Sequence, residues 1–277
     1  MKCSKQFLSI SILLMGIFAV NASVKAQSSL VLPSAIAQLT KQSEEPNAVD
    51  LYNQGVDKLE SGDFQGAIAD FTRAIQLNPQ DADTYYNRGY AYLALGNYQL
   101  AVEDYSQAIE LNSEYTYAYA NRCYAFYLMQ QYEAAISDCT QAITLEPNVA
   151  DFYIYRGNAQ VALNKYEAAI DDYDSAIGLN DKVANAYYQR ALAYTNLKKY
   201  DEALNDYTKS IDLDEKLADA FYERGLVNSQ LGNKVDAIAD LEQAAKLFEE
   251  QNKPEKSQEA LEALKNLRNE EESGNDE

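Results

Sequence analysis

The sequence repeats itself six times with a period of 34 residues, and this periodicity limits the possible fold more than any other feature. Two columns of the self-alignment, seven residues apart, hold almost only alanine. They contain Ala67, Ala101, Ala135, Ala169, Ala203 and Ala237, and Ala74, Ala108, Ala142, Ala176, Ser210 and Ala244. Seven residues make two helical turns, so each repeat is predicted to contain a helix that a neighbouring helix can approach closely.

Another column of small residues lies twelve positions earlier and indicates a preceding helix in each repeat. It contains Gly55, Gly89, Cys123, Gly157, Ala191 and Gly225. Between the two helices, four repeats have a residue that favours the left-handed conformation in which helices end, namely Gly62, Gly96, Asn164 and Gly232. Gln130 and Lys198 depart from this pattern. Each repeat is therefore predicted to be a hairpin of two helices.

This pattern resembles the tetratricopeptide repeat family, whose repeat has the same length. The family's aromatic residue near the start of the first helix is matched by Tyr85, Tyr119, Tyr153, Tyr187 and Phe221, with Leu51 in the first repeat. The resemblance covers residues 48–251 as repeats 48–81, 82–115, 116–149, 150–183, 184–217 and 218–251. It implies an all-α fold, an α-solenoid in the form of a right-handed superhelix, with a concave groove lined by the first helices.

The segments outside the repeats also have recognisable patterns. Residues 252–270 predict an amphipathic capping helix, with Ala260, Leu261, Leu264 and Leu267 inward, because a stacked array needs a polar end. Residues 271–277 predict an acidic disordered tail, and residues 27–47 a flexible linker.

Residues 1–26 have the features of a secretory signal peptide, with two lysines, an apolar run and small residues that end at Ala26. An uncleaved membrane anchor is the alternative, and Ala35-Ile36-Ala37 offers a second cleavage site. Cleavage would leave no segment for stable membrane insertion, so we expect an extracytoplasmic protein, periplasmic or secreted.

Charge and composition exclude several classes of function. The net charge of −20 repels nucleic acid. The chain has no histidine, so catalytic triads and imidazole metal sites are excluded, and neither a calcium loop nor a glycine-rich phosphate loop is present. We therefore expect a protein that is not an enzyme and that has no cofactor and no metal site.

Arginine and aspartate form two further columns, and we interpret them as a structural ladder. The arginines are Arg88, Arg122, Arg156, Arg190 and Arg224, and the aspartates are Asp70, Asp104, Asp138, Asp172 and Asp206, with Asp240 in the last repeat. The first repeat has Gln54 in the arginine column. A repeat without a predecessor would need no arginine, so we predict pairing between repeats, from Arg88 with Asp70 through Arg224 with Asp206.

Cys123 and Cys139 lie in the third repeat, at facing positions of its two predicted helices. Two interpretations stay open. They are two buried thiols that pack as small apolar groups, or a disulfide favoured by an oxidising compartment.

Tyrosine and asparagine recur on the first-helix face opposite the small column, and we predict that they line a ligand groove. These residues are Tyr52, Asn53, Tyr86, Asn87, Tyr90, Tyr117, Asn121, Tyr124, Asn158, Tyr188 and Tyr222. Tyrosine combines apolar area with a hydroxyl, which suits peptide recognition. For any one ring, packing between neighbouring repeats is the alternative. Family members that hold a carboxylate terminus use basic residues on this face, and these are absent here.

The expected partner is a protein or peptide, neutral or basic because the chain is acidic. Two alternatives are a structural subunit that forms homo-oligomers or joins an envelope assembly, and a glycan binder that stacks sugars on its aromatic rings.

Overall fold

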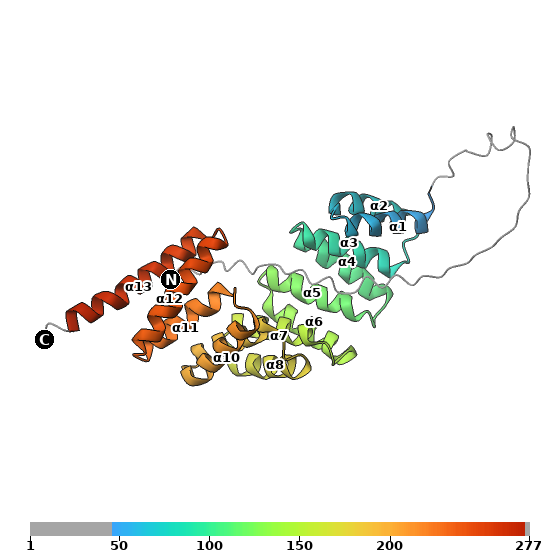
Figure 1. The fold of residues 1–277 in the computed structure, drawn as a ribbon. Helices are drawn as coiled ribbons and strands as arrows, with labels where there is room; N and C mark the ends of the chain where they lie inside the picture. Colours follow the sequence, from blue (N-terminus) through green and yellow to red (C-terminus); the bar gives the residue numbers. More distant parts are fainter. Residues whose placement is uncertain (1–45, 275–277) are drawn as a thin grey trace, which may run out of the picture. The chain divides into compact units, whose positions relative to one another are not determined.

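The computed structural model describes residues 46–274, which form thirteen α-helices and no strand. The first helices of the six hairpins are α1 (Ala48–Glu60), α3 (Ala82–Ala94), α5 (Thr116–Leu128), α7 (Ala150–Ala162), α9 (Ala184–Asn196) and α11 (Ala218–Gln230). The second helices are α2 (Phe64–Leu77), α4 (Tyr98–Leu111), α6 (Tyr132–Leu145), α8 (Tyr166–Leu179), α10 (Tyr200–Leu213) and α12 (Lys234–Glu250), and α13 (Pro254–Gly274) follows them (Figure 1). The predicted signal peptide and most of the predicted linker lie outside the described residues.

In the first, second and fourth hairpins, the two helices approach closely because a glycine faces an aromatic ring. A β-carbon on Gly55 would lie 2.5 Å from Cε1 of Phe71, and one on Gly157 would lie 2.7 Å from Cε1 of Tyr173. The alanine column is buried against the preceding helices. Small side chains on one helix thus make room for a large one on its partner, and this holds each hairpin together.

All six turns between the helices of a hairpin contain a residue with positive φ. Gly62, Gly96 and Gly232 have φ of 81°, 77° and 80°, and Gln130, Asn164 and Lys198 have φ of 62°, 58° and 60°. Gln130 and Lys198 therefore adopt the same left-handed conformation as the glycines they replace. The turn geometry is kept even where the sequence pattern is broken.

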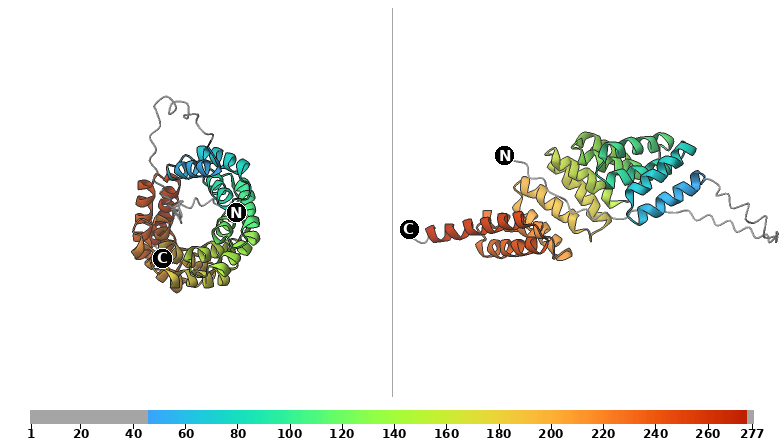
Figure 2. Two further views of the ribbon diagram at one scale, coloured as in Figure 1. Left: turned by 90° about the vertical axis from the view of Figure 1, so that its right-hand side faces the viewer. Right: turned by 90° about the horizontal axis from the view of Figure 1, so that it is seen from above.

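The array bends toward its first helices. Each first helix contacts the first helix of the next repeat, whereas no second helix contacts the second helix of the next repeat within residues 46–274. The first helices therefore line the shorter, inner side of the curve, and Figure 2 shows the hairpins following one another around an axis. We call the partly exposed side chains of this side the inner face.

Helix α13 packs on the last hairpin through Ala260, Leu264 and Leu267, which are buried beside residues of α11 and α12. Leu261 was also expected inward, but it is 47% exposed. Residues 260, 264 and 267 follow helical spacing on one face, and residue 261 lies about 100° away from residue 260. Within the described part of the chain, no helix has both the length and the apolar character needed to cross a membrane.

Candidate ligand-binding face

The prediction that the arginine ladder links each repeat to the one before it is wrong. Arg88 donates to Asp104 of its own repeat, with Nε–Oδ2 and Nη2–Oδ1 distances of 2.8 and 2.7 Å. The same two-bond pairing joins Arg122 to Asp138, Arg156 to Asp172, Arg190 to Asp206 and Arg224 to Asp240. In the first repeat, Lys58 takes the place of the arginine and pairs with Asp70.

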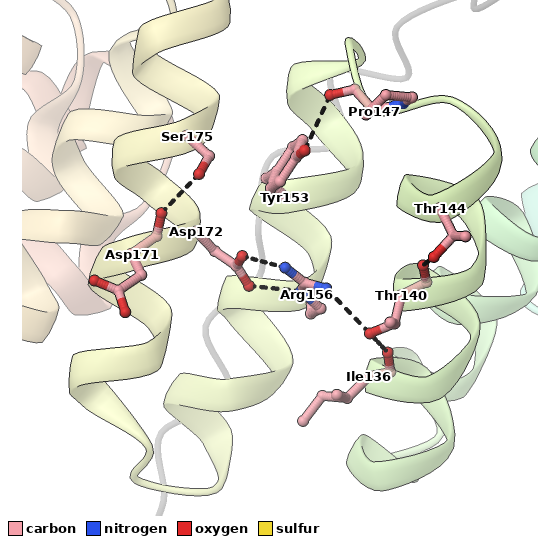
Figure 3. A network of polar contacts seen from close by, with 9 residues as sticks. All are labelled: Ile136, Thr140, Thr144, Pro147, Tyr153, Arg156, Asp171, Asp172 and Ser175. Atoms are coloured by element: carbon pink, nitrogen blue, oxygen red, sulfur yellow. Dashed lines mark hydrogen bonds and ion pairs between the residues drawn. The ribbon is translucent and has the colours of Figure 1, made fainter.

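Gln54 in the arginine column led to the wrong prediction of pairing between repeats, because Lys58, one helical turn later on α1, supplies the cation of the first repeat. The arginines do reach the preceding repeat, but through their third nitrogen and mostly to a hydroxyl. Arg156 Nη1 donates to Thr140 Oγ1 of α6 at 3.1 Å (Figure 3). Each arginine thus fastens its own hairpin and touches the previous one, and its bonds to Asp172 raise the pKa of Arg156.

Cys123 of α5 and Cys139 of α6 form a disulfide in the structure, with a Cα–Cα distance of 5.4 Å. Both residues are fully buried. In the other repeats these two positions hold a glycine or alanine and a larger side chain, such as Gly157 and Tyr173. The bridge therefore replaces, in the third hairpin, the packing of a large side chain against a small residue.

Most of the predicted tyrosines are partly exposed on the inner face. Tyr52, Tyr86, Tyr90, Tyr124 and Tyr222 are partly buried, and Tyr117 is 37% exposed. Tyr188 is an exception, because it is only 6% exposed and packs against Tyr207 of α10. Tyr188 is therefore a packing residue between helices and does not line an open face.

The predicted asparagines are mostly occupied by bonds within the array. Asn87 Nδ2 donates to the Tyr52 hydroxyl at 3.1 Å, and Asn121 Nδ2 donates to the Tyr86 hydroxyl at 3.0 Å, each across to the preceding first helix. Asn158 accepts a hydrogen bond from the Tyr173 hydroxyl at 2.8 Å. These three amides link helices to each other, which corrects the expectation that they face a ligand, while Asn53 is exposed.

The sequence did not lead us to predict two tyrosines that lie beside the predicted ones, Tyr155 and Tyr115. Tyr155 lies on α7 with its ring centroid 5.3 Å from that of Tyr124 on α5. Tyr115, just before α5, stacks on Tyr86 at 4.9 Å and donates to Asp83 at 2.7 Å. Tyr155 occupies the same repeat position as Asn53, Asn87 and Asn121. The fourth repeat of that column would therefore have pointed to it.

The inner face is acidic and has few cations to balance it. Each of the six first helices has one basic residue, and each of these pairs with an aspartate of a second helix. They are Lys58, Arg88, Arg122, Arg156, Arg190 and Arg224. Lys256 of α13 pairs with Asp219 at 2.6 Å. Asp83, Asp151 and Glu223 form no ion pair with any residue in the described range.

Burial raises the pKa of several groups on this face. It raises the pKa of Asp151, and it raises the pKa of Glu223 to about 7, with a further contribution from Asp219 and an opposing one from Lys256. The pKa of the Tyr124 and Tyr155 hydroxyls is raised for the same reason. Carboxylates that lose water without gaining a cation favour a positively charged ligand.

Residues 46–274 contain no group of three or more carboxylate or thiol side chains arranged to hold a metal ion. The inner face presents aromatic rings, hydroxyls and carboxylates.

Models of the tetratricopeptide repeat match residues 52–116, 116–149, 150–182, 184–217 and 218–251. The chain belongs to the tetratricopeptide repeat family. Because these matches run from within α1 to the end of α12, the inner face described above is that of a tetratricopeptide repeat solenoid. A comparison with curated protein sequences gave no match.

Solved structures with the same fold include other tetratricopeptide repeat proteins. The chain is 26% identical to MamA, with a TM-score of 0.57 over 62% of this chain and 94% of that one. It is also 26% identical to YrrB, described as a tetratricopeptide repeat protein with an unusual peptide-binding site, with a TM-score of 0.57 over 70% and 97% of the two chains. A tetratricopeptide repeat protein from Parabacteroides merdae has a TM-score of 0.62 at 19% identity, over 79% and 93% of the chains, and shows the fold alone.

Proposed function

We propose that this protein is a non-enzymatic, exported scaffold whose inner face binds an extended segment of another protein. The observation that carries the proposal is the composition of that face. It combines partly exposed tyrosines with carboxylates that no cation of the first helices balances. Aromatic side chains supply much of the binding energy of peptide interfaces, and uncompensated acids favour a neutral or basic ligand.

The similarity to YrrB supports the same proposal, because that protein is described as having a peptide-binding site and its structure covers most of this array. Basic side chains that would bind a carboxylate terminus are not free on the first helices, because all of them are engaged with aspartates. A ligand therefore binds along its length, without an anchor for its C-terminus.

Replacement of inner-face tyrosines tests the site. The pair Tyr90→Ala and Tyr124→Ala removes two partly exposed rings and no hydrogen bond between helices. Tyr166→Ala, at the start of α8 on a second helix, is the matched control. Pull-down from the protein's own compartment, followed by calorimetry with the captured segment as a synthetic peptide, should show binding lost in the double variant and kept in the control. Equal binding by all three proteins would reject the inner face as the site.

Export is tested separately, by the mass of the protein recovered from cell fractions. We expect a chain that lacks residues 1–26 in an extracytoplasmic fraction, with net charge −20 − 3 = −23 after loss of Lys2, Lys5 and Lys25. A full-length chain in the membrane fraction would favour a retained anchor, and a full-length chain in the cytoplasm would reject export.

A further inference from the structure

Three aspartates occupy the same position of the second, fourth and sixth repeats, in the first turn of α3, α7 and α11. Two of them have a side-chain partner from beyond their own hairpin. Asp83 accepts a hydrogen bond from the Tyr115 hydroxyl, and Asp219 pairs with Lys256. Asp151 has neither a hydrogen bond nor an ion pair to its side chain from any residue in the described range. The array leaves one of three equivalent carboxylates without a counterpart.

The surroundings of Asp151 are aromatic. Tyr155 follows one helical turn later on α7, and the pKa of its hydroxyl is raised by burial and, to a smaller extent, by the Asp151 charge. The Tyr155 ring lies 5.3 Å from the Tyr124 ring of α5, centroid to centroid. Asp151 is itself partly buried, and burial raises its pKa. A carboxylate next to one aromatic ring, with a second ring close to the first, attracts an organic cation both by charge and through the negative faces of the rings.

The end of the array shows how such a position holds a lysine. Lys256 of α13 places Nζ 2.6 Å from Asp219 Oδ1 and 5.5 Å from the centroid of the Phe248 ring. A carboxylate and an aromatic ring thus bind one ammonium group there. Asp151 has the same position in its repeat as Asp219 and has the Tyr155 ring nearby, but no lysine from residues 46–274 pairs with it.

We propose that Asp151, Tyr124 and Tyr155 form a subsite that binds a lysine or arginine side chain of the peptide on the inner face. This inference rests on the proposed function and narrows it to a ligand with a basic residue near the middle of the bound segment. The acidic, uncompensated inner face around the subsite favours the same charge.

Asp151 also lies in the first turn of α7, where a negative charge stabilises the helix through its dipole. That role alone would make substitution lower thermal stability without any change in ligand preference. Preference between ligands therefore separates the two roles.

The test uses full-length protein and four pools of short, fluorescently labelled peptides with acetylated and amidated ends. The pools are random in Gly, Ser, Ala, Leu and Pro except for a central Lys, Arg, norleucine or Glu. Fluorescence polarisation should show the Lys and Arg pools binding about tenfold more tightly than the norleucine pool, as expected for one charge-assisted contact, and the Glu pool binding most weakly.

Asp151→Asn keeps the shape of the side chain and should abolish this preference, whereas Asp151→Glu should retain part of it. Tyr124→Leu should reduce it severalfold through loss of a ring face. Asp171→Asn is the matched control, because Asp171 is an exposed aspartate on the second helix α8 and its loss changes the net charge equally.

The outcomes separate this inference from the proposed function. Binding of all pools without preference for Lys or Arg would overturn the subsite and leave peptide binding intact. A preference that persists in Asp151→Asn, or that Asp171→Asn removes equally, would also overturn the subsite. No binding by any pool, with circular dichroism showing a folded protein, would overturn both.

Discussion

Aspartates have regular partners in the arginine–aspartate ladder and varied surroundings on the inner face. In the ladder, each of the six aspartates on a second helix meets a cation from its own hairpin, and the pairs repeat with nearly constant geometry. On the inner face, the equivalent aspartates Asp83, Asp151 and Asp219 have three different environments. The pairs that recur in every repeat hold the hairpins together, whereas the carboxylates that differ between repeats are the ones we propose for ligand binding.

The largest expected difference between the ladder and the inner face is the loss of unfolding free energy when a charged side chain is replaced. Arg156 and Asp172 have side chains 19% and 6% exposed, so Arg156→Met leaves a buried carboxylate without its cation. We expect the free energy of unfolding to fall by about 3 kcal/mol, as for other broken buried pairs. Urea denaturation measures this, with Asp151→Asn as the comparison that should change it by only about 0.5 kcal/mol. Equal losses in the two variants would remove the distinction between ladder and inner face.

Glu223 provides a pH test of the inner face. Burial raises its pKa from 4.5 to about 7, and the groups that act on it are Asp219 of α11 and Lys256 of α13. The unfolded chain releases the proton at lower pH than the folded chain does. The contribution of this group is therefore fully present below pH 4.5 and is lost as pH rises to about 7.

We expect Glu223→Gln to remove a fall in unfolding free energy on the order of 2 kcal/mol across that interval. Denaturation of both proteins at several pH values measures it. Glu202→Gln, at an exposed position in the first turn of α10, is the control that should leave the pH profile nearly unchanged. Identical profiles for the Glu223 variant and the unsubstituted protein would show that this carboxyl is not desolvated.

The smallest effect concerns the hydrogen bonds between first helices. Tyr86→Phe leaves the Asn121 amide without the hydroxyl that accepts from it, and we expect a loss of about 1 kcal/mol in unfolding free energy. Tyr90→Phe removes the hydroxyl of a neighbouring inner-face tyrosine that forms no hydrogen bond with any residue from 46 to 274, so it should change stability by less. Thermal and urea unfolding of both variants would measure the difference. A larger loss in Tyr90→Phe than in Tyr86→Phe would contradict the structural role given to the Tyr86 hydroxyl.

The period of the sequence predicted the hairpins because every repeat has the same small, aromatic and turn positions, and their meaning depends only on helical spacing. The direction of the ladder was harder to predict. Arg88 lies 16 residues before Asp104 and 18 after Asp70, so both pairings satisfy the same columns. Only the packing of α3 against α4 brings Asp104 within hydrogen-bond distance of Arg88.

On the inner face, too, the sequence predicted positions but not which side chains pack against each other. The face to which Tyr188 belongs follows from its position in the repeat, but its burial depends on Tyr207 of the next helix. Asn87 and Asn121 contact two of the predicted tyrosines, but the sequence did not show that they donate to hydroxyls of the preceding repeat.

The sequence by itself determined the all-α solenoid, because a fixed period of small and large side chains leaves stacked helical hairpins as the fold that buries them. Tertiary structure decided which charges are matched and which are not, because a partner is chosen by distances of a few ångströms between helices. Asp172 and Asp151 are the same residue type in one repeat. Only the packing around them makes Asp172 a structural pair with Arg156 and leaves Asp151 beside Tyr155, without a cation from residues 46–274.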